Sequence, residues 1–424
     1  MKCLSCPDPF ESTLHYSSPA HGGWGVVRMG HLLPESYQLF VSPPACGRHG
    51  AISACMQGRK NRVSYLYLSE DDIVSGGYEE LLIEAVHELL AFLDRSGRRP
   101  KVLMIFVSCI DDLLGTDHEA LLARLRESCA DVRFTFCHMN PTSLDTGVPP
   151  PVNIRNKIYS LLDVVPEHDA GVNLIGSLVP LEAGCELFRM LPQMGAQPVR
   201  HITDFTTFDG FQQMARSRLN LVLAPPGKYP AEQLQEKHGI PFLPVLSSYN
   251  PAEVTRSYRE IAQALKADCP ELRPCEEACR SEMEETCRML GGRPVVLDGD
   301  AATRPFELAK ALLQTGFSVA RVITQKVIPS DREAYEWVCT RYPGLQLLQP
   351  QHHRTLLFED RMPDCLAIGY NSAYLTGSGH IVAADGHQGH WGYHGILELM
   401  RLIREAASST SDLKSLIEAA GLVV

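Results

Sequence analysis

Two cysteines in the first third of the chain have the local context of metal ligands. Cys46 stands in residues 42–50 (Ser-Pro-Pro-Ala-Cys-Gly-Arg-His-Gly), directly after the apolar residues 37–41. Cys109 follows residues 101–108, the strongest strand pattern in the sequence. A thiolate at a strand end, with glycines that let backbone N–H groups approach, suits an iron–sulfur cluster, because hydrogen bonds to cluster sulfurs tune its potential. The alternative is that both thiols pack as small buried hydrophobic groups.

Polar side chains in two regions are further candidates for contact with a cofactor. Arg48 and His49, with Arg28, could donate to cluster sulfurs or to an anionic substrate, or they are ordinary solvated charges. A glycine-rich loop near the C-terminus is surrounded by His380, His387, His390 and His394. Imidazoles there can ligate a metal or transfer protons, because their unperturbed pKa lies near neutrality; the alternative is a polar surface loop. The residues that we expect to bind a cofactor are Arg48, His49, His387 and His394.

The chain has 14 cysteines, a high number for a cytoplasmic protein, in which disulfides are rare. One group comprises Cys269, Cys275, Cys279 and Cys287. The last three share one broad face of a predicted helix. The group lacks the Cys-x-x-Cys spacing of a zinc site. We therefore predict that these cysteines pack in a helix as small side chains.

The elements that must position these residues have the pattern of an α/β fold. Short apolar runs alternate with amphipathic stretches, which is typical of βαβ units and parallel sheets. The predicted strands are residues 101–108, 171–176, 219–224, 294–297, 317–323, 365–369 and 380–383. The predicted helices are residues 78–94, 118–128, 181–194, 252–267, 304–315 and 396–406, and residues 251–290 form one long, nearly uninterrupted helical pattern.

These elements group into three Rossmann-like parallel-sheet domains around a central cleft, at residues 1–165, 166–290 and 291–424. A Pro-rich stretch at 146–153 and a Gly-Gly-Arg-Pro turn at 291–294 mark the boundaries. Ligands of an open α/β sheet bind beyond the carboxyl ends of its strands. Cysteines and histidines directly after strands are therefore the stronger candidates.

Composition and missing motifs exclude several classes of function. The formal net charge of −11 and the lack of any Lys/Arg-rich block argue against nucleic-acid binding. No run approaches the roughly 18 apolar residues of a membrane span, and the N-terminus lacks the apolar core of a signal peptide, so we expect a cytoplasmic protein. There is no phosphate-binding loop and no Gly-x-Gly-x-x-Gly after a strand, so neither ATP hydrolysis nor a dinucleotide cofactor is expected.

Six segments in the same order resemble motifs of the nitrogenase component 1 family, which includes the dark-operative protochlorophyllide reductase and a reductase of nickel-tetrapyrrole biosynthesis. They are residues 43–47 (Pro-Pro-Ala-Cys-Gly), 68–81 (Leu-Ser-Glu-Asp-Asp-Ile-Val-Ser-Gly-Gly-Tyr-Glu-Glu-Leu), 107–117 (Val-Ser-Cys-Ile-Asp-Asp-Leu-Leu-Gly-Thr-Asp), 172–176 (Val-Asn-Leu-Ile-Gly), 237–241 (Lys-His-Gly-Ile-Pro) and 392–395 (Gly-Tyr-His-Gly). Each segment alone is weak, but six in order from the first block to the last are specific.

The resemblance implies an iron–sulfur cluster, [4Fe–4S] or larger, between two homologous subunits that each supply up to three cysteines. Two of the family's three cluster-binding cysteines have counterparts in this chain, Cys46 and Cys109. The segment of this chain that matches the neighbourhood of the family's first cysteine contains no cysteine. Either Ser18 or His21 stands in for it, or the N-terminal Cys-x-x-Cys folds back, and we favour Cys6 as the third ligand.

The larger nitrogenase subunits hold a second metallocluster through a middle-domain cysteine, but the matching residues 221–227 contain none. The cleft is therefore expected to hold a different metallocofactor or an organic, tetrapyrrole-like substrate. The resemblance implies an oxidoreductase that works with an identical or homologous component 1 subunit, as a dimer or heterotetramer, and with a separate ATP-dependent iron–sulfur reductase. Two rival hypotheses remain: a non-catalytic scaffold for metallocofactor assembly, and a degenerate homologue that only binds a metabolite.

Overall fold

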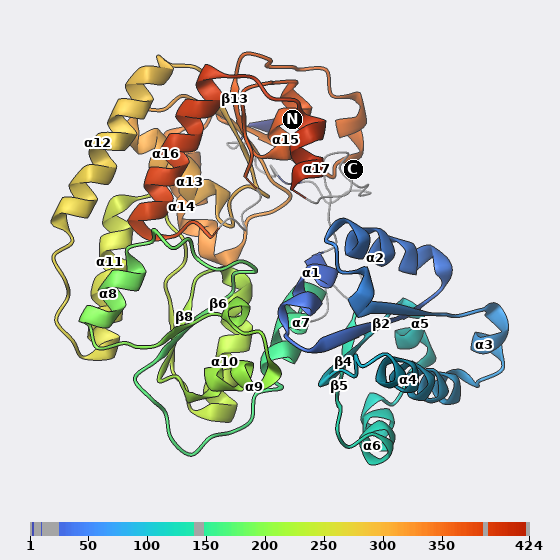
Figure 1. Ribbon diagram of the computed structural model, residues 1–424. Helices are drawn as coiled ribbons and strands as arrows, with labels where there is room; N and C mark the ends of the chain where they lie inside the picture. The colour runs from blue at the N-terminus through green and yellow to red at the C-terminus, as the bar shows by residue number, and fades with distance from the viewer. Residues whose placement is uncertain (1, 4–9, 11–24, 140–147, 385–388, 421–424) are drawn as a thin grey trace.

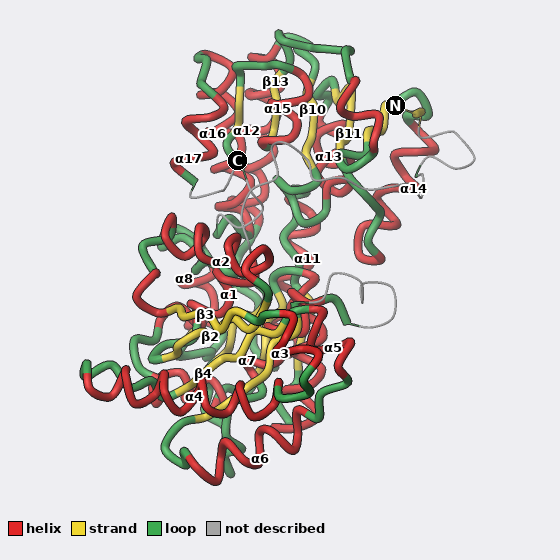
Figure 2. Tube along the Cα trace, turned by 90° about the vertical axis from the view of Figure 1, so that its right-hand side faces the viewer, coloured by secondary structure: helices red, strands yellow, loops and turns green. Residues whose placement is uncertain are grey.

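The computed structural model describes residues 2–3, 10, 25–139, 148–384 and 389–420. These residues form three α/β units in the order of the chain, each built on its own sheet (Figure 1). Figure 2 shows that helices and strands alternate along the chain in each unit. All strand pairs are parallel except the one that β1 makes. The predicted fold class, three parallel-sheet α/β units, is confirmed.

The first unit contains the N-terminal sheet, with the strand order β3-β2-β4-β5. Its strands are β2 (Ser36–Ser42), β3 (Val63–Tyr67), β4 (Val102–Val107) and β5 (Arg133–His138). Its helices are α1 (Gly25–Leu32), α2 (Pro44–Met56), α3 (Glu70–Val74), α4 (Tyr78–Arg95), α5 (Cys109–Leu114), α6 (His118–Ser128) and α7 (Pro150–Tyr159). Every residue of β4 is buried, as expected for a central parallel strand covered on both faces.

The second unit contains the middle sheet, with the strand order β7-β6-β8-β9. Its strands are β6 (Val172–Ile175), β7 (Val199–Arg200), β8 (Leu219–Val222) and β9 (Phe242–Pro244). Its helices are α8 (Leu187–Gln193), α9 (Phe208–Gln212), α10 (Lys228–His238) and α11 (Pro251–Leu265). This unit shares a core with each neighbour: Ile175 packs in one cluster with Ile154 of α7, and Leu174 in another with Val295 and Leu297.

The third unit contains the C-terminal sheet, with the strand order β1-β12-β11-β10-β13-β14. Its strands are β1 (Lys2–Cys3), β10 (Val295–Asp298), β11 (Val319–Ile323), β12 (Gln346–Leu348), β13 (Leu366–Ile368) and β14 (Ile381–Val382). Its helices are α12 (Arg273–Leu290), α13 (Pro305–Thr315), α14 (Arg332–Arg341), α15 (Tyr370–Thr376), α16 (Gly392–Ser408) and α17 (Leu413–Ala419). β1 pairs with β12, so the start of the chain extends the last sheet, not the first.

Two predicted helices differ from the structure. The pattern at 251–290 is divided into α11 and α12, because the chain leaves the helix at Lys266, whose φ is 54°. The predicted helix at 181–194 is reduced to α8, which begins only at Leu187. The residues before it form a loop that presents two glutamates to α16, described below.

Each sheet reverses its winding direction between two neighbouring strands: β2 and β4, β6 and β8, β10 and β13. Loops that leave such a pair diverge, which opens a crevice at the carboxyl edge. In the middle sheet, the loop after β6 and the loop after β8 are in contact near their starts, where Gly176 lies against Gly227. A Cβ on Gly227 would lie 2.7 Å from the Cα of Gly176, so this approach requires glycine.

We expect Gly227→Ala to destabilise the protein by about 1–3 kcal/mol, because backbone must move to admit the methyl group. The control is Gly344→Ala, where a Cβ meets nothing within 4 Å and the expected change is within about 0.5 kcal/mol. Urea unfolding measures both, and equal midpoints for the two variants would contradict the close approach.

Candidate functional site

The reversal point of the N-terminal sheet brings Cys46 and Cys109 to one edge. β2 and β4 are paired, with Val41 opposite Val107. Cys46 lies in the first turn of α2, which follows β2, and is exposed; Cys109 is the first residue of α5, which follows β4, and is half-buried. Because parallel strands end at the same edge, both cysteines lie at the carboxyl edge of this sheet, where its winding reverses.

Two serines at this edge have buried hydroxyls without a partner. Ser42 ends β2 and Ser108 follows β4, and both hydroxyls are buried without a hydrogen-bond partner among the residues that the structure describes. Next to Cys46, Gly47 is packed so closely that a Cβ would lie 2.9 Å from the ring of Tyr67. A buried donor normally finds an acceptor, and a cluster sulfide is one. The two thiols and two unpaired hydroxyl donors therefore fit a thiolate-bound iron–sulfur group.

A hydrogen-bonded cluster of acids and histidines supports the Cys109 turn. Asp111 accepts hydrogen bonds from the Tyr78 hydroxyl at 2.7 Å and from His118 Nε2 at 2.6 Å. Burial raises the pKa of Asp111, but the hydrogen bonds from His118 and Tyr78 outweigh burial and lower it overall. Asp112 lies 3.0 Å from Nδ1 of His138. Ligand atoms of Asp111, Asp112 and His138 lie within 4.8 Å of one another; Asp112 and His138 are paired with each other, and Asp111 is paired with Tyr78 and His118.

Large hydrophobic side chains are exposed around the cysteine edge. Val74 of α3 is 85 % exposed and Leu113 of α5 is 81 % exposed. Ile52 and Met56 of α2 and Tyr67 at the end of β3 are also exposed. Val74, Leu113 and Tyr67 belong to elements at this carboxyl edge, whereas Ile52 and Met56 lie toward the other end of α2. Such a group of apolar side chains is typical of a protein–protein contact surface.

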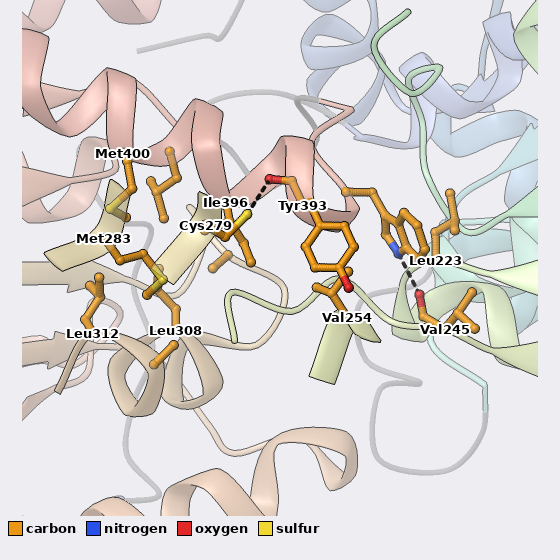
Figure 3. Packing of buried hydrophobic residues seen from close by; sticks show 14 of the residues in the cluster. Leu223, Val245, Val254, Cys279, Met283, Leu308, Leu312, Tyr393, Ile396 and Met400 are labelled. Atoms are coloured by element: carbon orange, nitrogen blue, oxygen red, sulfur yellow. Dashed lines mark hydrogen bonds between the residues drawn. The ribbon is translucent and has the colours of Figure 1, made fainter. Parts of the chain in front are cut away.

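A second crevice lies between the middle and C-terminal sheets. It is a cavity of about 50 Å³. Its lining includes Ser177 after β6, Leu223 after β8, Ala301 after β10, Ile368 at the end of β13 and His390 before α16. Leu223 and Leu308, which both line it, belong to the shared core drawn in Figure 3. Leu223 and Ala224 lie within residues 221–227, which match the segment that holds the middle-domain cysteine in the larger nitrogenase subunits, and here this part of the wall is apolar.

Two glutamates from the loop before α8 hold the start of α16. Glu186 accepts hydrogen bonds from the backbone N–H of Tyr393 at 2.8 Å and of His394 at 3.0 Å, and from the Tyr258 hydroxyl at 2.8 Å. A carboxylate is stabilising at a helix N-terminus, where N–H groups are unpaired and the helix dipole is positive. Gly392 permits this contact, because a Cβ there would lie 2.2 Å from Glu186 Oε1.

Glu182 contacts two histidines of the C-terminal segment. Its carboxylate lies 2.5 Å from Nε2 of His394 and 3.3 Å from Nε2 of His390. His390 lines the cavity and its side chain is 14 % exposed. Burial lowers the pKa of His390, although the carboxylates of Glu182 and Glu398 oppose this effect.

The predicted site residues have different outcomes. The structure brings Cys46 and Cys109 to one edge and places the exposed Arg48 two positions after Cys46 on α2. His49 lies in α2 with its side chain outside the described part, and Cys6 and His387 also lie outside the described residues. Both flanks of Cys6 contact the C-terminal unit, since Lys2–Cys3 pairs with β12 and Phe10 packs on Tyr335. His394 is engaged with Glu182 and is not part of the cavity lining.

Sequence reasoning missed Ser42, Ser108, Glu182 and Glu186. The two glutamates were assigned to a helix at 181–194, although Gly184 within that segment signals a break. Cys279 behaves as predicted for a packing residue: its thiol donates to the Tyr393 carbonyl (Figure 3), and burial raises its pKa to about 12.

We expect Glu186→Ala to destabilise the protein by about 2–3 kcal/mol, because it leaves two helix N–H groups and a buried hydroxyl unpaired. Thermal and urea unfolding measure the effect. Glu405→Ala, an exposed position on the same helix, is the control and should change stability by less than about 0.5 kcal/mol. Similar losses for the two variants would show that Glu186 is not the contact that orders α16.

Comparisons with known proteins give one consistent result. Residues 23–407 match the family model described as nitrogenase component 1 type oxidoreductase. The nitrogenase iron-molybdenum cofactor biosynthesis protein NifE of Clostridium pasteurianum is 24 % identical over 323 residues, covering 73 % of this chain and 68 % of NifE. NifE of Sinorhizobium fredii is 22 % identical over 362 residues, covering 79 % and 70 %.

Among solved structures, "Nitrogenase Cp1 at pH 6.5" matches with a TM-score of 0.72 and 15 % identity, covering 94 % of both chains. "Nitrogenase Cp1 at pH 5" matches with a TM-score of 0.61 and 14 % identity, covering 96 % of this chain and 93 % of the other. At this identity the structural matches establish the fold. Within the described residues, no helix is both long and apolar enough to cross a membrane.

Proposed function

The chain belongs to the nitrogenase component 1 type oxidoreductases, and we propose that it is a subunit that binds an iron–sulfur cluster through Cys46 and Cys109. The cluster lies at the interface with an identical or homologous subunit. It accepts electrons from a separate ATP-dependent iron–sulfur reductase and passes them to a substrate in the cleft between the units. The compartment is the cytoplasm, where both thiols stay reduced.

One observation supports the cluster most strongly: both cysteines begin the helices that follow the paired strands β2 and β4, and Ser42 and Ser108 at the ends of these strands have buried hydroxyls without a partner among the described residues. The N-termini of α2 and α5 add backbone N–H groups and a partial positive charge beside the sulfurs. A cluster would supply one-electron storage at this edge. The chain's own residues would bind it, donate hydrogen bonds from Ser42 and Ser108, and set its potential.

The number of thiolate ligands that a cluster needs and the exposed apolar side chains at this edge both support a subunit interface here. Iron–sulfur clusters of the common types have four thiolate ligands, and the described residues place two thiols at this edge. A matching pair from a second subunit completes four by two-fold symmetry. The exposed Val74 and Leu113 beside the thiols are then buried in the subunit contact. Cys6 stays a prediction for a third ligand.

A second candidate function is a scaffold on which a metallocofactor is assembled and handed on. It is favoured by the names of the relatives, which are cofactor biosynthesis proteins, and by the apolar wall at Leu223 and Ala224. A scaffold holds its cofactor transiently, so release to an acceptor protein without turnover under reducing conditions distinguishes it from the oxidoreductase.

Anaerobic purification with iron and acid-labile sulfide analysis tests the cluster. We expect Cys46→Ala and Cys109→Ala each to lose most of both elements, because each removes a ligand. Cys55→Ala, an exposed cysteine on the same helix as Cys46, should retain them. Wild-type protein that stays iron-free after anaerobic reconstitution with its partner subunit would overturn the proposal.

We expect Ser108→Ala to keep its iron but to lower the reduction potential of the cluster, because a hydrogen bond that stabilises the reduced, more negative cluster is lost. Redox titration followed by electron paramagnetic resonance measures the midpoint. Ser128→Ala, on an exposed helix end of the same unit, is the control. An unchanged potential in Ser108→Ala would exclude its hydroxyl as a donor to the cluster.

A further inference from the structure

The amino edge of the N-terminal sheet, opposite the cysteines, carries a concentration of basic residues. Residues 57–62 (Gln-Gly-Arg-Lys-Asn-Arg) connect α2 to β3, and residues 95–101 (Arg-Ser-Gly-Arg-Arg-Pro-Lys) lead from the end of α4 into β4. Both strands run parallel to β2, and Nη1 of Arg98 donates to the Asn61 carbonyl at 3.4 Å, so the fold brings the two segments together. They contain seven Lys and Arg residues and no Asp or Glu. We call these two segments the basic edge.

Most of the charge on the basic edge is not neutralised within the chain. Arg99 is paired with Asp131 at 2.5 Å, and Arg62 donates to the carbonyls of Leu33 and Ser36. Burial and the neighbouring Arg59 lower the pKa of Arg62 to about 10, because the positive charges repel one another. The basic residues that are exposed and form no ion pair with any described residue are Arg59, Lys60, Arg95, Arg98 and Lys101.

Exposed apolar side chains lie on both sides of the basic edge. Phe92, one turn before the end of α4, is 51 % exposed, and Ile52 and Met56 in the last turns of α2 are also exposed. The two helices pack on opposite faces of the sheet, because Ala54 of α2 belongs to one core cluster and Leu90 of α4 to another. The basic segments therefore lie between two apolar borders.

This combination of charge and apolar surface favours a protein as the occupant. Arg, Met and aromatic side chains are the types enriched in the cores of protein–protein interfaces. A ligand whose only recognition groups are phosphates would use the basic residues and leave Phe92 and Met56 exposed to water. An acidic segment that also carries apolar side chains complements both features, and opposite charges speed its encounter with this edge.

We propose that the basic edge is a docking surface for a partner protein, which it binds through an acidic segment with apolar side chains. Arg59 and Arg98 contact the carboxylates of that segment, and Phe92 and Met56 contact its apolar groups. The surface lies at the opposite end of the sheet from the cysteines, so this partner and a subunit at the cysteine edge bind together. The proposal does not depend on the cluster, and its failure leaves the iron analysis of the cysteine variants unaffected.

The test measures binding of a short fluorescein-labelled helical peptide of Glu, Leu and Phe to the full chain by fluorescence anisotropy. We expect saturable binding that weakens as salt is raised, and about tenfold weaker binding of a peptide in which Ser replaces Leu and Phe, because the apolar contacts are lost. Inorganic polyphosphate is the competitor. Absence of saturable peptide binding would overturn the proposal, and so would equal affinity of the two peptides together with tight displacement by polyphosphate, which would assign the edge to phosphate groups.

Variants locate the binding surface. The double variant Arg59→Glu with Arg98→Glu should weaken binding of the apolar peptide by about tenfold or more, because two attractive charges become repulsive. Phe92→Ser should weaken binding of the apolar peptide and leave binding of the Ser-containing peptide unchanged. The control is Arg256→Glu with Arg273→Glu, which changes the net charge equally at exposed positions of α11 and α12 and should leave the affinity unchanged. Equal losses in the two double variants would show attraction by net charge alone and contradict a docking surface. Thermal unfolding confirms that each variant is folded.

Discussion

The parallel pairing of β2 with β4 is the contact on which the candidate site depends. The two strands are far apart in sequence, and their register sets Val41 opposite Val107. The next residues, Ser42 and Ser108, then end the strands at the same level, and the helices that carry the two cysteines start directly beyond. A shift of one residue would turn every side chain of β4 to the other face, where it would no longer fit its core.

The middle unit links the two crevices of the molecule. It shares one core with the first unit and another with the third. Glu186 adds a polar contact to the second junction, because it orders the first turn of α16. The cavity and the cysteine edge are therefore both built at sheet reversals, but only the cavity lies between two units of this chain. The cysteine edge is open and has exposed apolar side chains.

Local pattern in the sequence was sufficient for the fold class and for several elements. α6 has the predicted bounds, α4 ends one residue later, and the long hydrophobic run of β4 was evident because a central parallel strand is buried on both faces. Strands β1, β7, β9 and β12 were missed, since two or three residues give no periodicity. The longer strands β3 and β5 were missed as well. The predicted helix at 252–267 ends within two residues of α11, whereas the longer helical pattern at 251–290 is divided at Lys266, with Pro270 in the segment between α11 and α12.

The candidate site was predictable only in part. Cys46 and Cys109 were identified because each follows a strand, a rule that needs no long-range contact. The pairing of Glu182 with His390 joins residues 208 positions apart, and no local pattern reports such a contact. The same holds for Glu186, whose role depends on the position of α16.

Site-resolved alkylation tests the central claim, that Cys46 and Cys109 bind one cluster, most directly. Cluster-loaded and chelator-stripped protein are treated anaerobically with iodoacetamide, and each cysteine is quantified by mass spectrometry. The account predicts that Cys46 and Cys109 are protected together in the loaded protein and react after stripping, while Cys55 reacts in both. Alkylation of either Cys46 or Cys109 to the same extent in loaded and stripped protein would contradict it.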